Sequence, residues 1–208
     1  MVIRSTLEWA RSLQALAQSG LAYDEPSVHD RERYEQVRRI AAEMLASTNG
    51  AGAEAIEQIF ARETGHATPK LDARGVVFKG DGILLVHERR DGLWTLPGGW
   101  VDVGESPSEA VTREVLEESG YRTRAAKILA LYDRDRQGHP PHPWHTWKAI
   151  FLCELLDEKQ EPLGHETAAA RFFTRSELPE LSMSRVTPRY IERAFDHRDH
   201  PEWPTDFD

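Results

Sequence analysis

The sequence predicts an α+β protein in which a small all-α domain, residues 1–66, precedes a larger mixed domain, residues 67–208. Three observations predict this class. Apolar residues recur at helical spacing through the first part of the chain, strand-like apolar runs begin near residue 71, and a strongly capped helix lies between further strands. A chain of 208 residues has room for one domain plus a small appendage.

The first part of the chain reads as three helices and a linker. The helices are expected over residues 3–19, from residue 27 or 30 to residue 45, and over residues 53–62, with the linker over residues 64–69. Gly20 is expected to end the first helix. About sixty residues barely bury a core alone, so these helices are expected to dock on the larger domain or on a second subunit.

The larger domain alternates strands with two helices. Strands are expected over residues 73–78, 83–87, 121–132, 146–156 and 171–173, a last helix over residues 184–195, and an irregular tail over residues 201–204. Lys79-Gly80-Asp81-Gly82 is a turn signal that joins the first two strands. Cys153 is the only cysteine, so no internal disulfide can form, and its apolar neighbours predict a buried strand thiol.

A helix with clear start and stop signals follows residue 106. Ser106-Pro107-Ser108-Glu109 has the form of a capping box with proline at the first helical position, and Gly120 can end the helix. Glu114, Glu117 and Glu118 fall on one face, where like charges repel each other and the helix dipole disfavours anions. A solvated acidic face is the plain interpretation of such a cluster, and a hard divalent cation is the functional one.

The residues before this helix favour the cation. Gly98 and Gly99 let the backbone approach a ligand closely, and a carbonyl there could join the carboxylates. Glu105 and Arg113 could pair across the start of the helix and fix the direction of Glu114. Carboxylates with a carbonyl form an all-oxygen set, which suits Mg²⁺ or Mn²⁺ better than zinc.

The stretch from Gly99 to Tyr121 fits Gly-x5-Glu-x7-Arg-Glu-apolar-x-Glu-Glu-x-Gly-apolar, with Tyr121 as the last apolar position. It resembles the Nudix box, the signature of hydrolases that act on a nucleoside diphosphate linked to another moiety. The resemblance implies an α/β/α sandwich with a mixed sheet, and a pyrophosphohydrolase that uses Mg²⁺ or Mn²⁺. It also implies metal ligation by the Gly99 carbonyl and by Glu114, Glu117 and Glu118.

In the family the metal activates a water that attacks one phosphorus, and a carboxylate takes the proton. The base is either a box glutamate, here Glu114, or a glutamate from a later loop, for which Glu166 is the candidate. Arg113 and Glu105 complete the expected catalytic set. An ordinary loop carboxylate is the alternative for Glu166.

Substrate specificity is expected from outside the box. The segment from Tyr132 to Lys148 mixes cations, histidines, aromatics and prolines, and long loops near sites often carry function. The candidate substrate-binding residues are Arg89, Arg134, Arg136, Trp144 and Lys148. A zinc site of His139, His142 and His145 is disfavoured by the interleaved prolines and the lack of a nearby cysteine.

The N-terminal segment carries a second resemblance. Leu7-Glu8-Trp9-Ala10 and Asp30-Arg31-Glu32-Arg33-Tyr34-Glu35 look like the helical domain that precedes some bacterial Nudix enzymes, among them the CDP-choline pyrophosphatases. This resemblance implies CDP-choline, cleaved to CMP and phosphocholine. ADP-ribose is the alternative; relatives that prefer it carry a proline at a set distance past the box, and Pro140 and Pro141 come somewhat later.

Two further classes stay open. A nucleotide-sensing Nudix regulator would often lack box carboxylates, and RNA-end processing would favour a basic groove around Arg134, Arg136 and Lys148. The net charge of −9 gives no basis for a broad nucleic-acid footprint. With no apolar run long enough to span a bilayer and no signal-peptide core, the expectation is a cytoplasmic protein that does not bind a membrane. Its expected partners are a small nucleotide substrate and a second copy of the chain in a homodimer.

Overall fold

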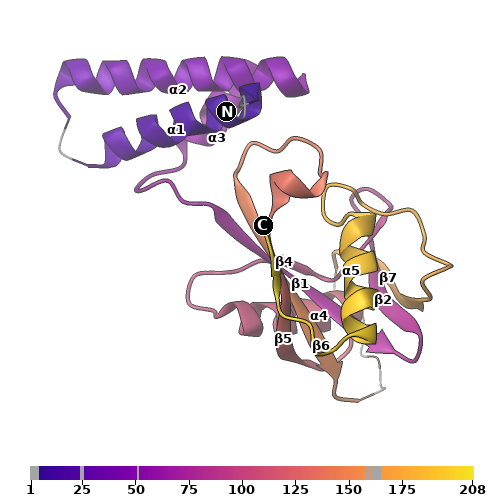
Figure 1. Cartoon of the computed structure of the whole chain (residues 1–208). Helices are drawn as coiled ribbons and strands as arrows, with labels where there is room; N and C mark the ends of the chain where they lie inside the picture. Colours follow the sequence, from indigo (N-terminus) through magenta and orange to yellow (C-terminus); the bar gives the residue numbers. More distant parts are fainter. Residues whose placement is uncertain (1–4, 24–25, 51, 158–159, 161–164) are drawn as a thin grey trace. The chain divides into compact units, whose positions relative to one another are not determined.

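The computed structural model describes residues 5–23, 26–50, 52–157, 160 and 165–208. By its internal contacts the chain divides into two units, which are shown in Figure 1. The first comprises residues 1–69 with residues 141–145, and the second comprises residues 70–140 and 146–208. Among the described residues, no helix combines the length and the apolar character needed to cross a membrane.

The first unit contains the three predicted helices, α1 (Thr6–Ala22), α2 (Val28–Asn49) and α3 (Ala53–Ala61). Their buried faces form one cluster of small and apolar side chains, which includes Ala10, Ala41, Leu45, Ile56 and Phe60. Ser5 caps α1 in a capping box with Glu8, and Ser27 caps α2. Residues 3 and 4, where the first helix was expected to begin, lie outside the described residues.

The predicted end of the first helix at Gly20 is wrong, because α1 continues to Ala22. The glycine serves packing instead. A Cβ built on Gly20 would lie 2.4 Å from the ring of Tyr34 on α2. The missing side chain therefore lets the aromatic ring of the neighbouring helix lie directly against the backbone of α1.

The second unit is built on a mixed sheet of eight strands among the described residues. The strands are β1 (Lys70–Lys79), β2 (Gly82–Glu88), β3 (Trp94–Thr95), β4 (Gly98–Trp100), β5 (Thr123–Asp133), β6 (Thr146–Leu155), β7 (Thr167–Phe173) and β8 (Asp206–Phe207). The main order is β3-β2-β1-β6-β5-β8, while β4 pairs with β1 and β7 pairs with β2. The central β1–β6 pair is parallel.

Helices cover both faces of this sheet, as the α/β/α expectation requires (Figure 1). Helix α4 (Pro107–Ser119) packs Val111 and Val115 against one face, and α5 (Pro188–Asp199) packs Ile191 and Phe195 against the other. The two faces alternate along β1, where Val77 belongs to the α4 layer and Val76 to the α5 layer. Cys153 is buried in the α4 layer, as predicted.

Several local features differ from the sequence prediction, among them the start of β7 at Thr167 and not at residue 171. The last helix begins at Pro188 and not at residue 184, because proline favours the first helical position and disfavours helical backbone in the residue before it. The short strands β3 and β4 were not predicted. Beyond the irregular residues 201–204, β8 pairs with β5, and Asp206 receives two hydrogen bonds from Arg193 of α5, at 2.8 and 2.9 Å.

Candidate active site

Helix α4 carries the carboxylate face, and its ends are fixed as the sequence predicts. The Oγ of Ser106 accepts from the amide of Glu109 at 3.3 Å, and the Glu109 carboxylate accepts from the amide of Ser106 at 2.8 Å. Gly120 ends the helix in a left-handed conformation, with φ of 73°. Since Val115 is fully buried, the angle of the carboxylate face to the sheet is also fixed.

Arg113 binds the outer side of this face. Its guanidinium makes a fork on Glu105, with Nε–Oε1 at 2.8 Å and Nη2–Oε2 at 2.9 Å, so the predicted pair is present. Its Nη1 also donates to Glu114 and to Glu117, each at 3.0 Å. The hydrogen bonds from Arg113 hold the pKa of Glu105 below its usual value. One cation thus joins the segment before α4 to two of the three glutamates.

Glu118 occupies the inner side of the face and is 6% exposed. Its Oε2 accepts from the amide of Gly98 at 2.7 Å, and its main-chain carbonyl accepts from the Thr167 hydroxyl of β7 at 2.7 Å. Burial raises the pKa of Glu118 to about 8, against the opposing effects of Arg74 and the Gly98 amide. Burial likewise raises the pKa of Glu114, and Arg113 opposes that shift.

The two glycines at the start of β4 allow its backbone to lie close to both β1 and α4. Gly98 has φ of 137°, and a Cβ there would lie 2.1 Å from the carbonyl oxygen of Ala73. A Cβ on Gly99 would lie 3.0 Å from Oε1 of Glu114. Gly98 requires glycine, because a side chain there would collide with the backbone of β1, whereas a side chain at residue 99 would crowd the Glu114 carboxylate and force it to shift.

The donor set fits a hard divalent cation. Three carboxylates lie on one helix face beside a glycine backbone, and the most buried of them, Glu118, receives one neutral donor on its carboxylate. A buried carboxylate with one direct hydrogen-bond donor keeps acceptor capacity and is a favourable partner for a cation. Glu114, Glu117, Glu118 and the Gly99 carbonyl could hold such an ion, which when bound would neutralise charge on a diphosphate and activate water.

Glu166 and Arg89 lie next to the C-terminal end of α4. The side chain of Glu166 is exposed, and its carbonyl accepts from the amide of Arg89 at 3.0 Å. The next residue, Thr167, is the one that binds the Glu118 carbonyl. Both predicted residues therefore belong to a segment anchored to the end of the carboxylate helix, and Arg89 is exposed there as well.

The other predicted substrate-binding residues lie in different environments. Lys148 is 2% exposed and its Nζ donates to Asp72 at 2.8 Å, while the 3% exposed Arg134 donates to the carbonyls of Pro140 and Ser184. Arg136 is exposed and lies 3.7 Å from Asp133. Trp144 belongs to the first unit, where its ring contacts that of Phe60 at 5.7 Å.

The surroundings of Lys148 and Arg134 leave them little room to bind a substrate. Buried cations already bonded to protein oxygens have little donor capacity and little surface to offer a substrate. Direct substrate contact by Lys148 and Arg134 is therefore not supported by their surroundings. His139, from the same segment, also has protein partners: its Nδ1 lies 2.7 Å from the Met183 carbonyl oxygen and its Nε2 lies 3.0 Å from the Tyr190 hydroxyl.

Sequence reasoning did not single out the buried charges beneath the loop. Asp72 and Arg74 are each 5% exposed and lie on the same side of β1. Glu88, at the end of β2, is also 5% exposed, and Arg185 lies 3.3 Å from it. The sequence did carry a signal for the first pair: Asp72 and Arg74 have opposite charges, stand at alternate positions and come directly before the apolar residues of the strand. Such spacing predicts an ion pair on one face of the strand.

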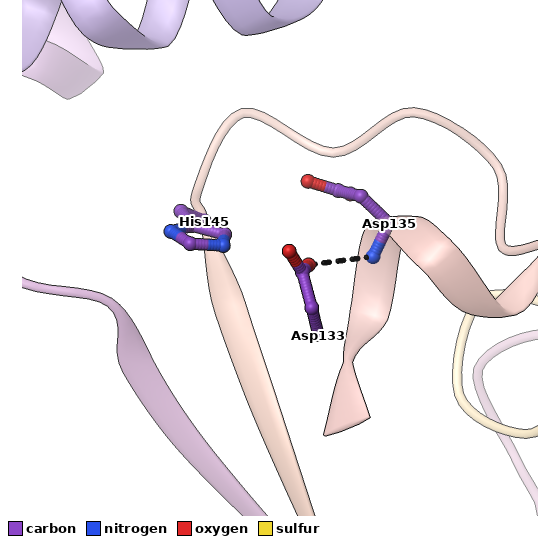
Figure 2. A group of neighbouring side chains, drawn as sticks. All are labelled: Asp133, Asp135 and His145. Atoms are coloured by element: carbon purple, nitrogen blue, oxygen red, sulfur yellow. Dashed lines mark hydrogen bonds between the residues drawn. The ribbon is translucent and has the colours of Figure 1, made fainter. Parts of the chain in front are cut away.

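A second group of possible metal ligands consists of Asp133, Asp135 and His145, drawn in Figure 2. In this group one possible ligand atom from each side chain lies within 4.8 Å of the other two, a spacing found for this set among the described residues. The amide of Asp135 donates to the Asp133 carboxylate at 3.0 Å, the bond drawn in Figure 2. Each aspartate also has an arginine partner, because Arg134 lies 3.8 Å from Asp135 and Arg136 lies 3.7 Å from Asp133. We assign no function to it.

Comparison with known proteins places this geometry in a family. Residues 68–194 match the family model of the NUDIX domain, and residues 4–60 match the model of a UDP-X-like, N-terminal oligomerisation domain. The chain therefore belongs to the Nudix family, as the box predicts. It is an enzyme of the pyrophosphatase type that hydrolyses nucleotide-linked diphosphates, and Nudix hydrolases use divalent metal cations.

Individual relatives cover most or all of the chain. A Bacillus subtilis protein named "Putative ADP-ribose pyrophosphatase" is 44% identical over 97% of this chain and 96% of its own length. A crystal structure of a UDP-X diphosphatase is 30% identical, covers 98% of both chains and has a TM-score of 0.63. The structure of an ADP-ribose pyrophosphatase from Streptococcus suis is 38% identical over 68% of this chain and 100% of its own, with a TM-score of 0.62.

Proposed function

We propose that this enzyme hydrolyses the pyrophosphate bond of a nucleoside diphosphate conjugate, with Mg²⁺ or Mn²⁺ held by Glu114, Glu117, Glu118 and the Gly99 carbonyl. The observation that carries the proposal is the contact between the Gly98 amide and the buried Glu118 carboxylate at 2.7 Å. It aims the innermost ligand at the glycine loop, where Gly99 leaves room beside Glu114.

The remaining box residues have separate tasks in this proposal. Arg113, paired with Glu105, sets the direction of Glu114 and Glu117 and keeps them from spreading into solvent. Glu114 or Glu166 takes the proton from the attacking water. Glu166 is exposed on the segment anchored to α4, so its carboxylate can reach the site from solvent without first leaving a buried ion pair.

The proposed substrate is ADP-ribose, with CDP-choline as the second candidate. ADP-ribose is supported by the names of two relatives, of which the Bacillus protein is 44% identical over nearly the whole chain. The choice of CDP-choline rests on the N-terminal resemblance alone. The UDP-X diphosphatase, similar over 98% of the chain, supports a pyrimidine nucleotide conjugate as the wider alternative.

³¹P NMR of the purified chain with Mg²⁺ or Mn²⁺ tests reaction and substrate together. ADP-ribose, CDP-choline and UDP-glucose are supplied in separate tubes, with the Glu118→Gln variant as the blank. AMP and ribose 5-phosphate from the first tube support the proposal, and CMP and phosphocholine from the second alone would restore CDP-choline. If none is cleaved, the proposed substrates are refuted, and 5′-pyrophosphate RNA and ligand sensing are tested next.

We also propose that the chain forms a homodimer through its N-terminal helices. This segment matches an oligomerisation domain model. On α1, Trp9 and Leu16 are 49% and 65% exposed and lie two helical turns apart on one side. Apolar side chains so exposed on a small helical unit favour burial against a second copy.

Light scattering of the full chain tests the dimer. The double variant Trp9→Ser, Leu16→Ser is expected to halve the mass at low micromolar concentration, because the proposed contact loses its apolar area. Leu156→Ser removes a leucine of similar exposure, 60%, from the other unit and should leave the mass unchanged. A wild-type monomer, or a double variant that stays dimeric, would refute this surface.

A further inference from the structure

A buried charge cluster lies beneath the glycine loop, and the proposed reaction gives it no role so far. Arg74 donates to both carboxylate oxygens of Asp72, from Nε and from Nη2, each at 2.8 Å. Lys148 donates to the same carboxylate at 2.8 Å. The two partners of Asp72 come from neighbouring strands, since Lys148 of β6 is the register partner of Asp72 in β1.

The cluster reaches the loop through the third arm of Arg74. Its Nη1 donates to the carbonyl of Leu96 at 3.2 Å. The carbonyl of Pro97 then accepts from the amide of Gly75 at 2.8 Å, and the amide of Gly98 donates to Glu118. Three successive residues, Leu96, Pro97 and Gly98, are thus held by these hydrogen bonds, two of which come from β1.

The same cation acts on the carboxylates themselves. Burial raises the pKa of Glu118 and Glu114, and the charge of Arg74 opposes that shift at both carboxylates. The charges of Asp72 and Glu118 in turn favour the protonated form of Arg74. Arg113 supplies positive charge at the solvent side of the face, whereas Arg74 supplies it from within the protein. Because Asp72 and the Leu96 carbonyl lock the guanidinium, it cannot swing toward solvent when a metal ion approaches.

We infer that Asp72, Arg74 and Lys148 form a positioning triad that holds the Leu96–Gly98 segment, and with it Glu118, in place for metal binding. The inference rests on the proposed metal site. It also assigns Lys148 to the support of Asp72 instead of to the substrate. A fixed second layer matters because metal ligands oriented by outer partners bind their ion more tightly.

The triad is tested by Mn²⁺ affinity, measured by electron paramagnetic resonance of free Mn²⁺ in the full-length protein. Arg74→Lys keeps the charge but loses the fork and its reach to Leu96, and should weaken Mn²⁺ binding about 10-fold. Asp72→Asn, of the same shape, should weaken it in the same direction. In steady-state assays at saturating Mn²⁺, both should lower kcat with little change in the KM for substrate, since neither side chain touches the substrate.

The matched control is Arg193→Lys, which breaks a second two-armed Arg–Asp fork, with Asp206, on the α5 side of the same unit. It should leave Mn²⁺ affinity within twofold of wild type. Folded Arg74→Lys and Asp72→Asn with equally unchanged affinity would overturn the triad. Should both fail to fold while Arg193→Lys folds, the triad serves folding alone, and the inference is also overturned.

Failure of the underlying proposal gives a different pattern. Wild-type protein that binds no Mn²⁺, or Glu118→Gln protein that binds it as tightly as wild type, would refute the proposed metal site itself. Wild-type binding that is lost in Glu118→Gln but retained in Arg74→Lys refutes only the role of the triad.

Discussion

Replacing Glu118 by glutamine separates the metal site from the fold. In the wild-type protein the Gly98 amide donates to Oε2 of Glu118 at 2.7 Å. The side-chain oxygen of glutamine can accept the same hydrogen bond, so the segment around Gly98 keeps its contact with α4. The substitution also removes an ionisable group from a side chain that is only 6% exposed, where burial disfavours the charged form. The metal-free variant is therefore expected to be at least as stable as wild type.

Activity is expected to behave in the opposite way. A metal ion stabilises transition-state charge by several kcal/mol, and loss of about 3–4 kcal/mol corresponds to a fall of roughly 100- to 1000-fold. Turnover with saturating Mg²⁺ and thermal unfolding without metal measure the two effects in one preparation. Glu109→Gln, on the same helix but in the capping box, should keep near-normal turnover. Near-normal turnover of Glu118→Gln would refute the assignment of the ligand face.

Three further predictions concern stability. Ser106→Ala removes the cap of α4 and should cost about 1 kcal/mol, seen as a Tm lowered by about 2–4 °C; an unchanged Tm would contradict the cap. Gly75→Ala places a Cβ 2.5 Å from Cγ2 of Val115 and should cost about 1–3 kcal/mol, with partial recovery when Val115→Ala is added. Burial lowers the pKa of His139 to about 4, below the 6.5 of a free histidine, so its contribution to stability is present above pH 6.5 and lost as pH falls toward 4. His139→Gln should flatten the fall of Tm across that range, and an unchanged slope would contradict this.

The predictable part of the fold was the part set by local chemistry. Capping residues and periodicity predicted α4 and the two longest helices of the first unit within a few residues at each end. Gly20 misled the prediction, because a glycine that ends a helix and a glycine that admits a neighbouring ring look alike in sequence. The short β3 and β4 strands escaped because two or three residues carry no periodic signal.

In the candidate site, too, the contacts between residues close in sequence were predictable and those made by the sheet were not. Arg113 pairs with Glu105 and Glu114, both within eight residues of it, so motif spacing was enough to predict the Arg113–Glu105 pair that directs Glu114. The additional hydrogen bond from Arg113 to Glu117 was not predicted. Lys148 is 76 residues from Asp72 and lies opposite it only because β6 runs parallel to β1. A cation in a long polar segment therefore looked like a ligand-binding residue, although the sheet buries it.

The two arginines also explain why a helix with three clustered carboxylates is stable before any metal arrives. Arg113 compensates Glu114 and Glu117 from solvent, where its contribution is weakened by screening. Glu118 faces inward, where an isolated charge would be costly, and the positive charge of Arg74 in β1 opposes that cost. The outer ligands can thus exchange Arg113 for a metal ion by small side-chain movements. The inner ligand cannot move without breaking its hydrogen bond to the Gly98 amide, so we expect Glu118 to set the position of the ion and Glu114 and Glu117 to adjust to it.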